Sequence, residues 1–335
     1  MFMKITIKEV AEQANVSPST VSRVISNSSQ ISEKTKERVR EVINELNYKP
    51  NAFARSLANK KSRILGVILP SEASDLLLNP FFLQAMKGMS TYAKKKKYYI
   101  TYAFSEDDRE EEDYIKDFIN SNLIAGVCLL RVKTEDKSID YLKKMNFPFV
   151  VIGRPEETEG MLWVDNDNFK ATYNLVNKLV QMGHSKIAYI GAKEDLTVTK
   201  DRLKGFKVAC EMNGISVDDN NIIMKDEFTE EEGIKATEEL IGNNIATAII
   251  AQDDLIAFGT LKALNSNRID NVSVVGFNNS QLAEFQNPPL ASIDINATEL
   301  GYYAAKVLIE YLENNNVQVN HYIVDSKLIE RESLR

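Results

Sequence analysis

The stretches TIKEVAEQANVSPSTVSRVISN (residues 6–27) and NYKPNAFARSLA (residues 47–58) decide the fold of the N-terminal part of this chain. The first predicts two short helices. Thr6 is placed to cap one of them, and Ser17 caps the other with Pro18 at its first position, where the missing N–H costs nothing. Two short helices joined by so tight a turn form a helix-turn-helix, whose second helix can enter the major groove of DNA.

The predicted second helix has two faces of different character. Its inner face carries Val21, Val24 and Ile25, which would hold it to a core. A third amphipathic helix over residues 32–46 brings Val39, Val42, Ile43 and Leu46 to that core. The outward face of the second helix is small and polar with one long cation, and consists of Ser17, Pro18, Ser19, Ser22, Arg23 and Ser26.

Residues 47–50, Asn-Tyr-Lys-Pro, predict a turn that ends the third helix. Asn51 can cap a short helix over AFARSLA, residues 52–58. So short a helix is unstable alone in water, so we expect it to fray until something orders it.

Length and composition bound the remaining possibilities. A chain of 335 residues suggests two or three domains, and an apolar fraction of 44% is ordinary for a soluble protein. No apolar run is long enough to span a bilayer. The first ten residues lack the apolar run of a signal peptide, so we expect a cytoplasmic protein. Cys128 and Cys210 are then most simply buried thiols.

The net charge of −7 conceals a division. Residues 1–63 hold twelve Lys/Arg and six Asp/Glu, a net +6, whereas the remainder holds 29 and 42, a net −13. A basic head on an acidic body fits a module that meets phosphate.

Beyond residue 63, apolar strands alternate with amphipathic helices. ILGVILP (64–70) is a continuous apolar run, typical of a buried parallel strand. Further strands are predicted at 98–104, 126–130, 149–152, 186–190, 246–250 and 272–277. Helices are predicted at 81–95, 109–120, 139–145, 169–182, 202–213, 229–242, 255–265 and 299–314. Such alternation predicts an α/β class with helices on both faces of parallel sheets.

The sequence argues against catalysis. Its two histidines, His184 and His321, have no Cys, Asp or His nearby at metal-ligand spacing. No phosphate-binding loop, glycine-rich dinucleotide turn or nucleophile elbow is present. We therefore expect no enzyme, no catalytic residue, no metal and no cofactor.

VSPSTVSRVIS and YKPNAFARSLA resemble the DNA-binding headpiece of the lactose-repressor (LacI/GalR) family of bacterial transcription regulators. The resemblance continues through NPFF (79–82), DRLKGF (201–206) and VSVVGFNNS (272–280), and covers nearly the whole chain. It implies a two-lobed body of the periplasmic-binding-protein type I. The implied domains are a headpiece at 1–47, a hinge at 48–62 and an effector domain at 63–335. Within that domain, the implied N-lobe covers 63–160 and 293–321, and the C-lobe covers 163–290 and 323–335.

The resemblance also assigns DNA contacts. The base-reading residues would be Ser17, Pro18, Ser19 and Arg23 of the second helix, which also carries Thr20. The phosphate contacts would be Thr6, Ser22, Ser32, Thr35, Tyr48 and Asn51. In the hinge, Ala54 and Leu57 share one face, and Leu57 holds the position of the family's leucine wedge, which kinks the operator at its centre.

In the effector cleft, Arg202 falls at the arginine that usually clamps hydroxyls or carboxylates of the ligand. Gln252 stands where Asn is usual, and Asn278 where Asp is usual. Phe81 or Phe82 would pack against a sugar ring, and Arg154 would reach inward. An amide in place of an acid predicts a neutral, polyhydroxylated ligand, although two arginines leave a sugar phosphate open.

IGRP (152–155), MLWVDNDN (161–168) and GFNNS (276–280) resemble the maltose-operon regulators of Gram-positive bacteria. The implied function is a repressor that binds a palindromic operator and is released by a small carbohydrate, with maltose as first candidate. Without a trailing leucine heptad, a homodimer is expected. The alternatives are a catabolite-control regulator that reads a phosphocarrier protein and, far behind, a solute-binding protein, which would lack the basic head.

Overall fold

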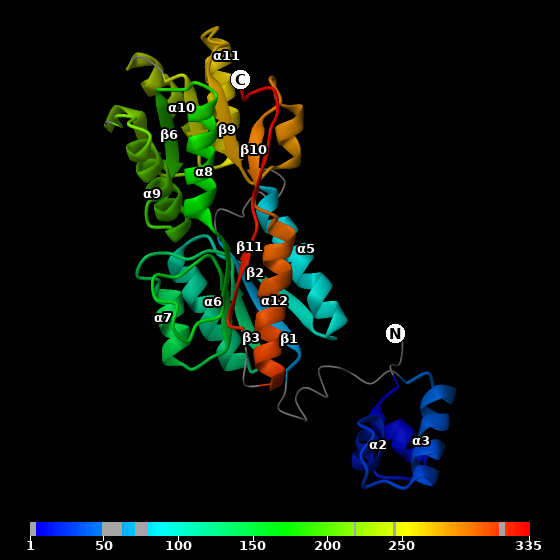
Figure 1. Cartoon of the computed structure of the whole chain (residues 1–335). Coiled ribbons are helices and arrows are strands. Elements are labelled where there is room, and N and C mark those ends of the chain that lie inside the picture. Colours follow the sequence, from blue (N-terminus) through cyan, green and yellow to red (C-terminus); the bar gives the residue numbers. More distant parts are fainter. Residues whose placement is uncertain (1–4, 49–61, 71–78, 218, 244–245, 315–318) are drawn as a thin grey trace. The chain divides into compact units, whose positions relative to one another are not determined.

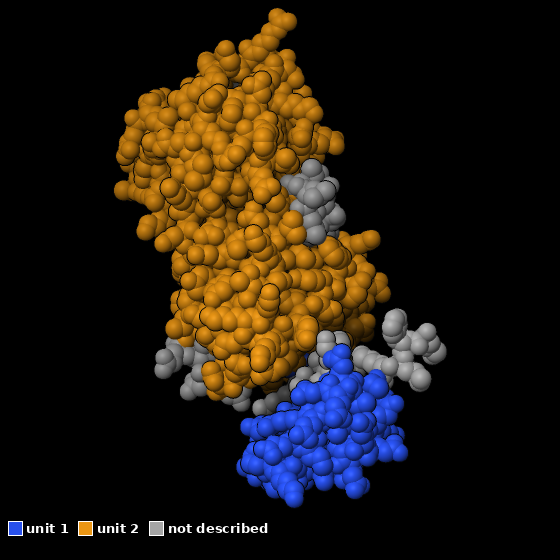
Figure 2. All heavy atoms as spheres, turned by 90° about the vertical axis from the view of Figure 1, so that its right-hand side faces the viewer, with its two compact units in different colours: residues 1–62 blue, residues 63–335 orange. Residues whose placement is uncertain are grey.

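The structure, a computed structural model, describes residues 5–48, 62–70, 79–217, 219–243, 246–314 and 319–335. The chain divides into two units, residues 1–62 and residues 63–335, which Figure 2 colours separately.

Unit 1 contains the predicted three helices, α1 (Ile7–Gln13), α2 (Pro18–Ile25) and α3 (Glu33–Glu45). Each begins at a hydroxyl cap. The Thr6 side chain accepts from the Glu9 amide, and the Glu9 carboxylate accepts from the Thr6 amide, which makes a capping box. Ser17 and Ser32 cap the other two helices. The helices enclose a small core of Val10, Ala11, Ala14, Val21, Val24, Val39 and Val42.

Unit 2 consists of two six-stranded sheets, arranged one above the other in Figure 1. The N-lobe sheet has the order β11-β5-β4-β3-β1-β2 and the C-lobe sheet the order β12-β10-β9-β8-β6-β7. The pairs are parallel except that of β10 with β12. The strands of the N-lobe are β1 (Ile64–Leu69), β2 (Tyr99–Phe104), β3 (Gly126–Leu129), β4 (Phe149–Ile152), β5 (Trp163–Asn166) and β11 (His321–Val324). Those of the C-lobe are β6 (Ile187–Ala192), β7 (Ile222–Lys225), β8 (Ala248–Ala251), β9 (Ser273–Phe277), β10 (Ala291–Asp294) and β12 (Lys327–Ile329).

Helices cover both faces of each sheet because successive side chains of a buried strand point to opposite faces. In β1, Leu65 and Val67 pack with α5 and α12, while Ile64 and Ile68 pack with α6 and α7. In the C-lobe, α8 and α9 pair on one face and α10 and α11 on the other. None of the helices in the described ranges is long and apolar enough to cross a bilayer. Their bounds are α5 (Pro80–Lys95), α6 (Asp108–Ser121), α7 (Lys137–Lys144), α8 (Asn168–Gln181), α9 (Thr197–Met212), α10 (Glu230–Gly242), α11 (Asp254–Ser266) and α12 (Ala297–Asn314).

The chain passes between the lobes three times, at positions that differ from those expected. The crossings lie at residue 167, between β5 and α8; at 295–296, between β10 and α12; and at 325–326, between β11 and β12. Each lies later in the chain than the expected lobe boundary. The displacement arises because β5 and β11 extend the N-lobe sheet and β10 extends the C-lobe sheet before the chain crosses.

The strands that the sequence did not predict are β5, β7, β10, β11 and β12. Of these, β11, β12 and β7 lie at sheet edges. Exposed positions interrupt the pattern of β11 and β12, and β7 has a single buried residue. β5 is fully buried, yet its second half is Asp165-Asn166. Two adjacent polar residues are not typical of an interior strand. We therefore attribute this pair to a functional site rather than to packing of the sheet.

Two glycines allow close packing of α5 against α12, two helices of the N-lobe that lie side by side in Figure 1. A Cβ built on Gly301 of α12 would lie 1.9 Å from the Ala85 carbonyl oxygen, and one on Gly88 of α5 would lie 1.9 Å from the Thr298 carbonyl oxygen. Both atoms belong to backbone, which cannot move aside as a flexible side chain can. The helices can therefore approach this closely only where a side chain is absent.

Gly301→Ala is expected to destabilise unit 2 by about 1–3 kcal/mol, because α12 must move away from α5 to admit the methyl group. Gly242→Ala is the matched control, since Gly242 ends α10 and a Cβ added there would meet no atom within 4 Å. Denaturant unfolding followed by circular dichroism measures both. Equal stability of the two variants would contradict the close packing.

Candidate functional site

The outward face of α2 is open to solvent. Ser17, Pro18, Ser19 and Arg23 are exposed, and Thr20 and Ser22 are half-buried. The Ser17 hydroxyl lies 2.8 Å from the Ser19 hydroxyl and 2.9 Å from that of Thr20. The cap that starts the helix therefore also orders the hydroxyls at its exposed end, beside the positive end of the helix dipole. A phosphate or a base edge would meet these groups first.

The expected phosphate contacts fall around this helix. Thr6 and Ser32 are exposed caps, and the Thr35 hydroxyl lies 2.9 Å from that of Ser32. Tyr48 is half-buried against the headpiece core. The hinge residues Asn51, Ala54 and Leu57 lie outside the described residues.

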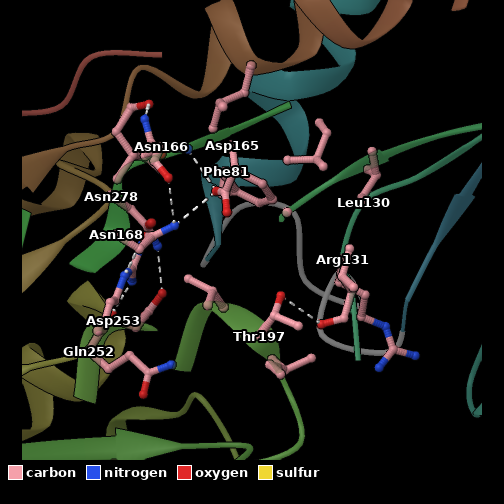
Figure 3. Close-up of a pocket in the computed structure, with 18 of the residues that line it drawn as sticks. Phe81, Leu130, Arg131, Asp165, Asn166, Asn168, Thr197, Gln252, Asp253 and Asn278 are labelled. Carbon is pink, nitrogen blue, oxygen red and sulfur yellow. Dashed lines mark hydrogen bonds between the residues drawn. The ribbon is translucent and has the colours of Figure 1, made fainter. Parts of the chain in front are cut away.

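A second candidate site is a cleft between the lobes of unit 2, lined from both sheets (Figure 3). Its N-lobe side is largely apolar and its C-lobe side largely polar. The apolar lining residues of the N-lobe and the crossings are Phe81, Phe82, Leu130, Val132, Ile152, Ile295 and Leu300. The polar lining includes Arg131, Asp165, Asn166, Asn168, Thr197, Arg202, Gln252, Asp253 and Asn278. Most of these residues follow the carboxyl ends of parallel strands, the usual place for ligands in open α/β sheets.

Arg202 is the polar centre of the cleft. It lies on α9 with only 6% of its surface exposed. Its Nε donates to the Asn168 side-chain oxygen at 2.9 Å, and its Nη1 donates to the Gln252 carbonyl oxygen at 2.7 Å. The guanidinium lies 4.1 Å from the ring centre of Phe277. Three groups thus hold the guanidinium in place where Arg202 lines the cleft.

Asp165, Asn166 and Asn168 join this network from the first crossing, and the sequence reasoning did not assign them to the site. The Asn168 amide donates to the Asp165 carboxylate at 2.9 Å, and the Asn166 backbone N–H donates to the same oxygen at 2.8 Å. Figure 3 shows the three residues near one another beside the cleft. Their signal in the sequence was present: four consecutive acid or amide side chains, at residues 165–168, directly after an apolar segment.

Gln252 and Asn278 act on the cleft in different ways. The Gln252 side chain turns into the C-lobe, where its oxygen accepts from the Tyr189 hydroxyl at 3.2 Å and its amide donates to Thr199. It is fully buried, so it supports Arg202 through its backbone carbonyl. The Asn278 amide donates to the Asp253 carboxylate at 2.6 Å. Although position 278 holds an amide, the Asp253 carboxylate beside it still offers a hydrogen-bond acceptor.

The surroundings of the Asp165 and Asp253 carboxyl groups disfavour their charged forms. Burial raises the pKa of Asp165 to about 6 and that of Asp253 to about 6, and in each case the hydrogen bonds it accepts and the charge of Arg202 only partly offset this. Arg131 also lines the cleft, 3.2 Å from the carboxylate of Glu111. Within the described ranges, no three His, Cys, Asp or Glu side chains are grouped to hold a metal ion.

Arg154 was expected to reach into the cleft, and the structure contradicts this. Its side chain is exposed and lines a separate surface pocket with Lys200 and Lys204. Its guanidinium lies 5.7 Å from the ring centre of Trp163. Only its backbone N–H, which donates to Asp165 at 2.8 Å, touches the cleft network. The sharp turn at Gly153, with φ of 120°, directs the following side chain outward.

A latch joins the lobes at the mouth of the cleft, formed by residues 132–134 of the N-lobe and 195–197 of the C-lobe. The Thr197 N–H donates to the Val132 carbonyl at 3.1 Å, and the Thr134 N–H donates to the Asp195 carbonyl at 2.8 Å. An ion pair between Lys133 and Asp195, at 3.4 Å, reinforces it. The cleft therefore lies between this latch and the three crossings.

Comparisons with known proteins cover both units of the chain. Residues 6–51 match the model of bacterial regulatory proteins of the lacI family, and residues 176–334 match a periplasmic binding protein-like domain. The HTH-type transcriptional regulator MalR of Streptococcus pneumoniae serotype 4 is 35% identical over 98% of this chain and 100% of its own length.

The chain belongs to the lacI family of bacterial regulatory proteins. It is a transcription regulator with a DNA-binding helix-turn-helix. Catabolite control protein A of Priestia megaterium is 29% identical over 94% of this chain and 95% of that protein. A solved complex of the transcriptional regulator CelR with cellobiose is 26% identical, with a TM-score of 0.76 over 98% of this chain and 99% of that one.

In this lacI-family chain, a further buried acid lies behind the cleft wall. Asp254, at the start of α11, accepts from the Ser292 hydroxyl and from the Ser280 N–H, both at 2.6 Å. Burial is the main cause that raises its pKa to about 7, and the adjacent charge of Asp253 adds to it. Because the folded pKa exceeds the ordinary value of 3.8, the protonated form favours folding. This contribution to the free energy of unfolding is lost as the pH rises to about 7.

Asp254→Asn removes this titration. Between pH 5 and pH 8, the wild type should lose about 2 kcal/mol of unfolding free energy relative to the variant, by linkage from the shifted pKa. Urea unfolding at both pH values measures the difference, in which any constant packing cost of the amide cancels. A difference between the two proteins that does not change with pH would show that Asp254 titrates normally.

Proposed function

We propose that this chain is a homodimeric repressor of a sugar-utilisation operon, acting in the cytoplasm, which a small neutral carbohydrate releases from its operator. The observation that carries the proposal is one chain with an exposed, capped recognition helix and a cleft that both lobes line with apolar and polar side chains. The helix offers hydroxyls and a cation to DNA. The cleft offers a fixed guanidinium and carboxylates to a hydroxylated ligand.

Exposed apolar side chains support the dimer. Tyr99 and Phe104 are exposed on β2, an edge strand of the N-lobe sheet. In the C-lobe, Phe285 is 80% exposed beside Leu282. Large apolar groups left in water on both lobes are typical of an interface with another copy. A symmetric dimer then requires a near-palindromic operator.

Arg23 is the expected reader of guanine, because an arginine fork can pair with the two acceptors on the major-groove edge of that base. Arg23→Ala should relax specificity at one symmetric position of each half-site by about 1–3 kcal/mol. Binding to a library of single-base operator variants measures this. If the variant binds every operator more weakly by the same factor, Arg23 contacts phosphate instead.

The ligand class follows from the charge of the cleft. Arg131 is paired with Glu111, so within the described residues Arg202 is set against two carboxylates, Asp165 and Asp253. Two carboxyl groups against one guanidinium give the described part of the cleft more acidic than basic groups. A phosphate or carboxylate ligand would be repelled, whereas sugar hydroxyls can donate to the carboxylates and accept from Arg202. The apolar wall of Phe81, Phe82 and the neighbouring aliphatic residues suits the C–H face of a sugar ring.

Similarity to MalR and to the CelR–cellobiose complex supports a glucose disaccharide, and maltose is the first candidate. A sugar held between the lobes touches both of them, so it binds one lobe angle better than another. Only such a difference can shift a conformational equilibrium. Movement of the N-lobes across the dimer would then separate the hinges and weaken DNA binding.

By linkage, operator DNA must weaken maltose binding by the same factor by which maltose weakens operator binding. This factor corresponds to a coupling free energy of typically about 1–3 kcal/mol. Calorimetric titration with and without operator measures this. Arg202→Ala should lose maltose binding while operator affinity and cooperative unfolding are retained. Arg154→Ala is the matched control, because it removes an arginine outside the cleft and should leave maltose binding unchanged.

Equal maltose affinity with and without operator would reject induction by this sugar. If the chain does not respond to sugars, the alternative function is regulation by a phosphocarrier protein that binds unit 2. Similarity to catabolite control protein A permits this function. Titration with a phosphocarrier protein then decides whether the chain has that function.

A further inference from the structure

All relative movement of the lobes must be absorbed where the chain crosses between them. The crossings at residue 167, residues 295–296 and residues 325–326 are the covalent links, and each is only one or two residues long. Backbone rotation at so few positions would allow twisting as well as opening. Whatever holds these segments to one another therefore selects which motion the lobes can make.

The side chain of Asn166 holds all three. It stands at the end of β5, directly before the first crossing, and is 5% exposed. Its Nδ2 donates to the carbonyl of Ile295 in the second crossing at 3.0 Å. It also donates to the carbonyl of Val324, directly before the third crossing, at 2.8 Å. Both amide protons are thus used on carbonyls from distant parts of the sequence.

The same residue faces the cleft and is connected to its central arginine. Arg202 of the C-lobe donates to Asn168, Asn168 donates to Asp165, and the Asn166 N–H donates to the same Asp165 oxygen. Figure 3 shows Asn166, Asp165 and Asn168 side by side at the cleft wall. A ligand that displaces Arg202 or Asp165 must therefore shift or strain the backbone that carries the Asn166 amide.

The latch at the opposite side of the cleft defines the motion. It consists of two backbone hydrogen bonds and an ion pair between loops, which can break and re-form as the cleft opens. The crossings cannot separate. Opening would therefore be a rotation about the crossings, and the Asn166 amide lies among them.

We propose that Asn166 is a positioning residue, which clamps the three crossings into one hinge and thereby converts occupancy of the cleft into a defined change of lobe angle. The clamp itself is a property of unit 2. Its role in transmitting the sugar signal rests on the function proposed above.

The first test needs no ligand. Spin labels are attached to the full-length protein at Lys144→Cys in the N-lobe and Asn243→Cys in the C-lobe, both exposed positions, while Cys128 and Cys210 are buried and stay unlabelled. The distribution of label distances is compared in three backgrounds: the otherwise unaltered protein, Asn166→Ala and Asn174→Ala. Asn174 is an exposed asparagine of α8 and serves as the control.

Asn166→Ala should broaden the distance distribution, and Asn174→Ala should leave it unchanged. A second variant, Asn166→Asp, turns a carboxylate toward the two carbonyls and should broaden it at pH 8. At pH 5, the protonated acid can again donate one hydrogen bond, so the distribution should narrow, beyond any change that the unaltered protein shows. If both variants fold cooperatively and keep the narrow distribution at both pH values, the clamp does not exist.

The second test measures transmission with maltose. The ratio of operator affinities without maltose and with saturating maltose should fall toward one in Asn166→Ala. Because Asn166 lines the cleft, each protein is saturated according to its own maltose affinity, so a change in that affinity does not enter the ratio. An unchanged ratio in a variant with a broadened distribution would overturn the transmitting role. If the unaltered protein itself shows no maltose effect, the proposed ligand fails, whereas the distance measurement still decides the clamp.

Discussion

The buried charge of Arg202 is the constraint on which unit 2 depends. A guanidinium removed from water must have its charge and its donors met by oxygen atoms, or the fold loses several kcal/mol. Unit 2 meets part of that demand with a carbonyl from the end of β8, a side-chain oxygen at the start of α8 and nearby carboxylates. Arg202 also lines the cleft. In the function proposed above, the hydroxyls of the sugar would add further oxygen partners for its guanidinium.

The same requirement explains why a polar strand end is buried at the centre of the molecule. Asp165 and Asn166 would destabilise an ordinary parallel sheet, yet here their side chains bind the backbone of the turn after β4 and of the second and third crossings. Polar groups cost free energy when buried without partners, but fully paired they fix one arrangement among many. Hydrophobic packing builds each lobe, and this polar network sets how one lobe meets the other.

Local signals in the sequence were enough for the headpiece, for the helices of the lobes and for their interior strands other than β5 and β10. Hydroxyl caps, the proline after Ser17 and the apolar run at 64–70 report directly on neighbouring backbone, so those predictions are confirmed. The crossings and the site were less accessible. Whether Arg154 points inward depends on the turn at Gly153, and Asp165 acquires its role only from Arg202, 37 positions away. Motif resemblance located Arg202 but gave no account of what holds it.

The order of strands has a consequence for synthesis of the protein on the ribosome. The helices of the headpiece are complete within the first 48 residues, so this part can fold as soon as it emerges. The N-lobe instead needs α12 and β11, and the C-lobe needs β12, all from the last 40 residues of the chain. Neither sheet can close until translation is nearly finished. A nascent or prematurely terminated chain would therefore contain a folded DNA-binding headpiece without a folded unit 2 to regulate it.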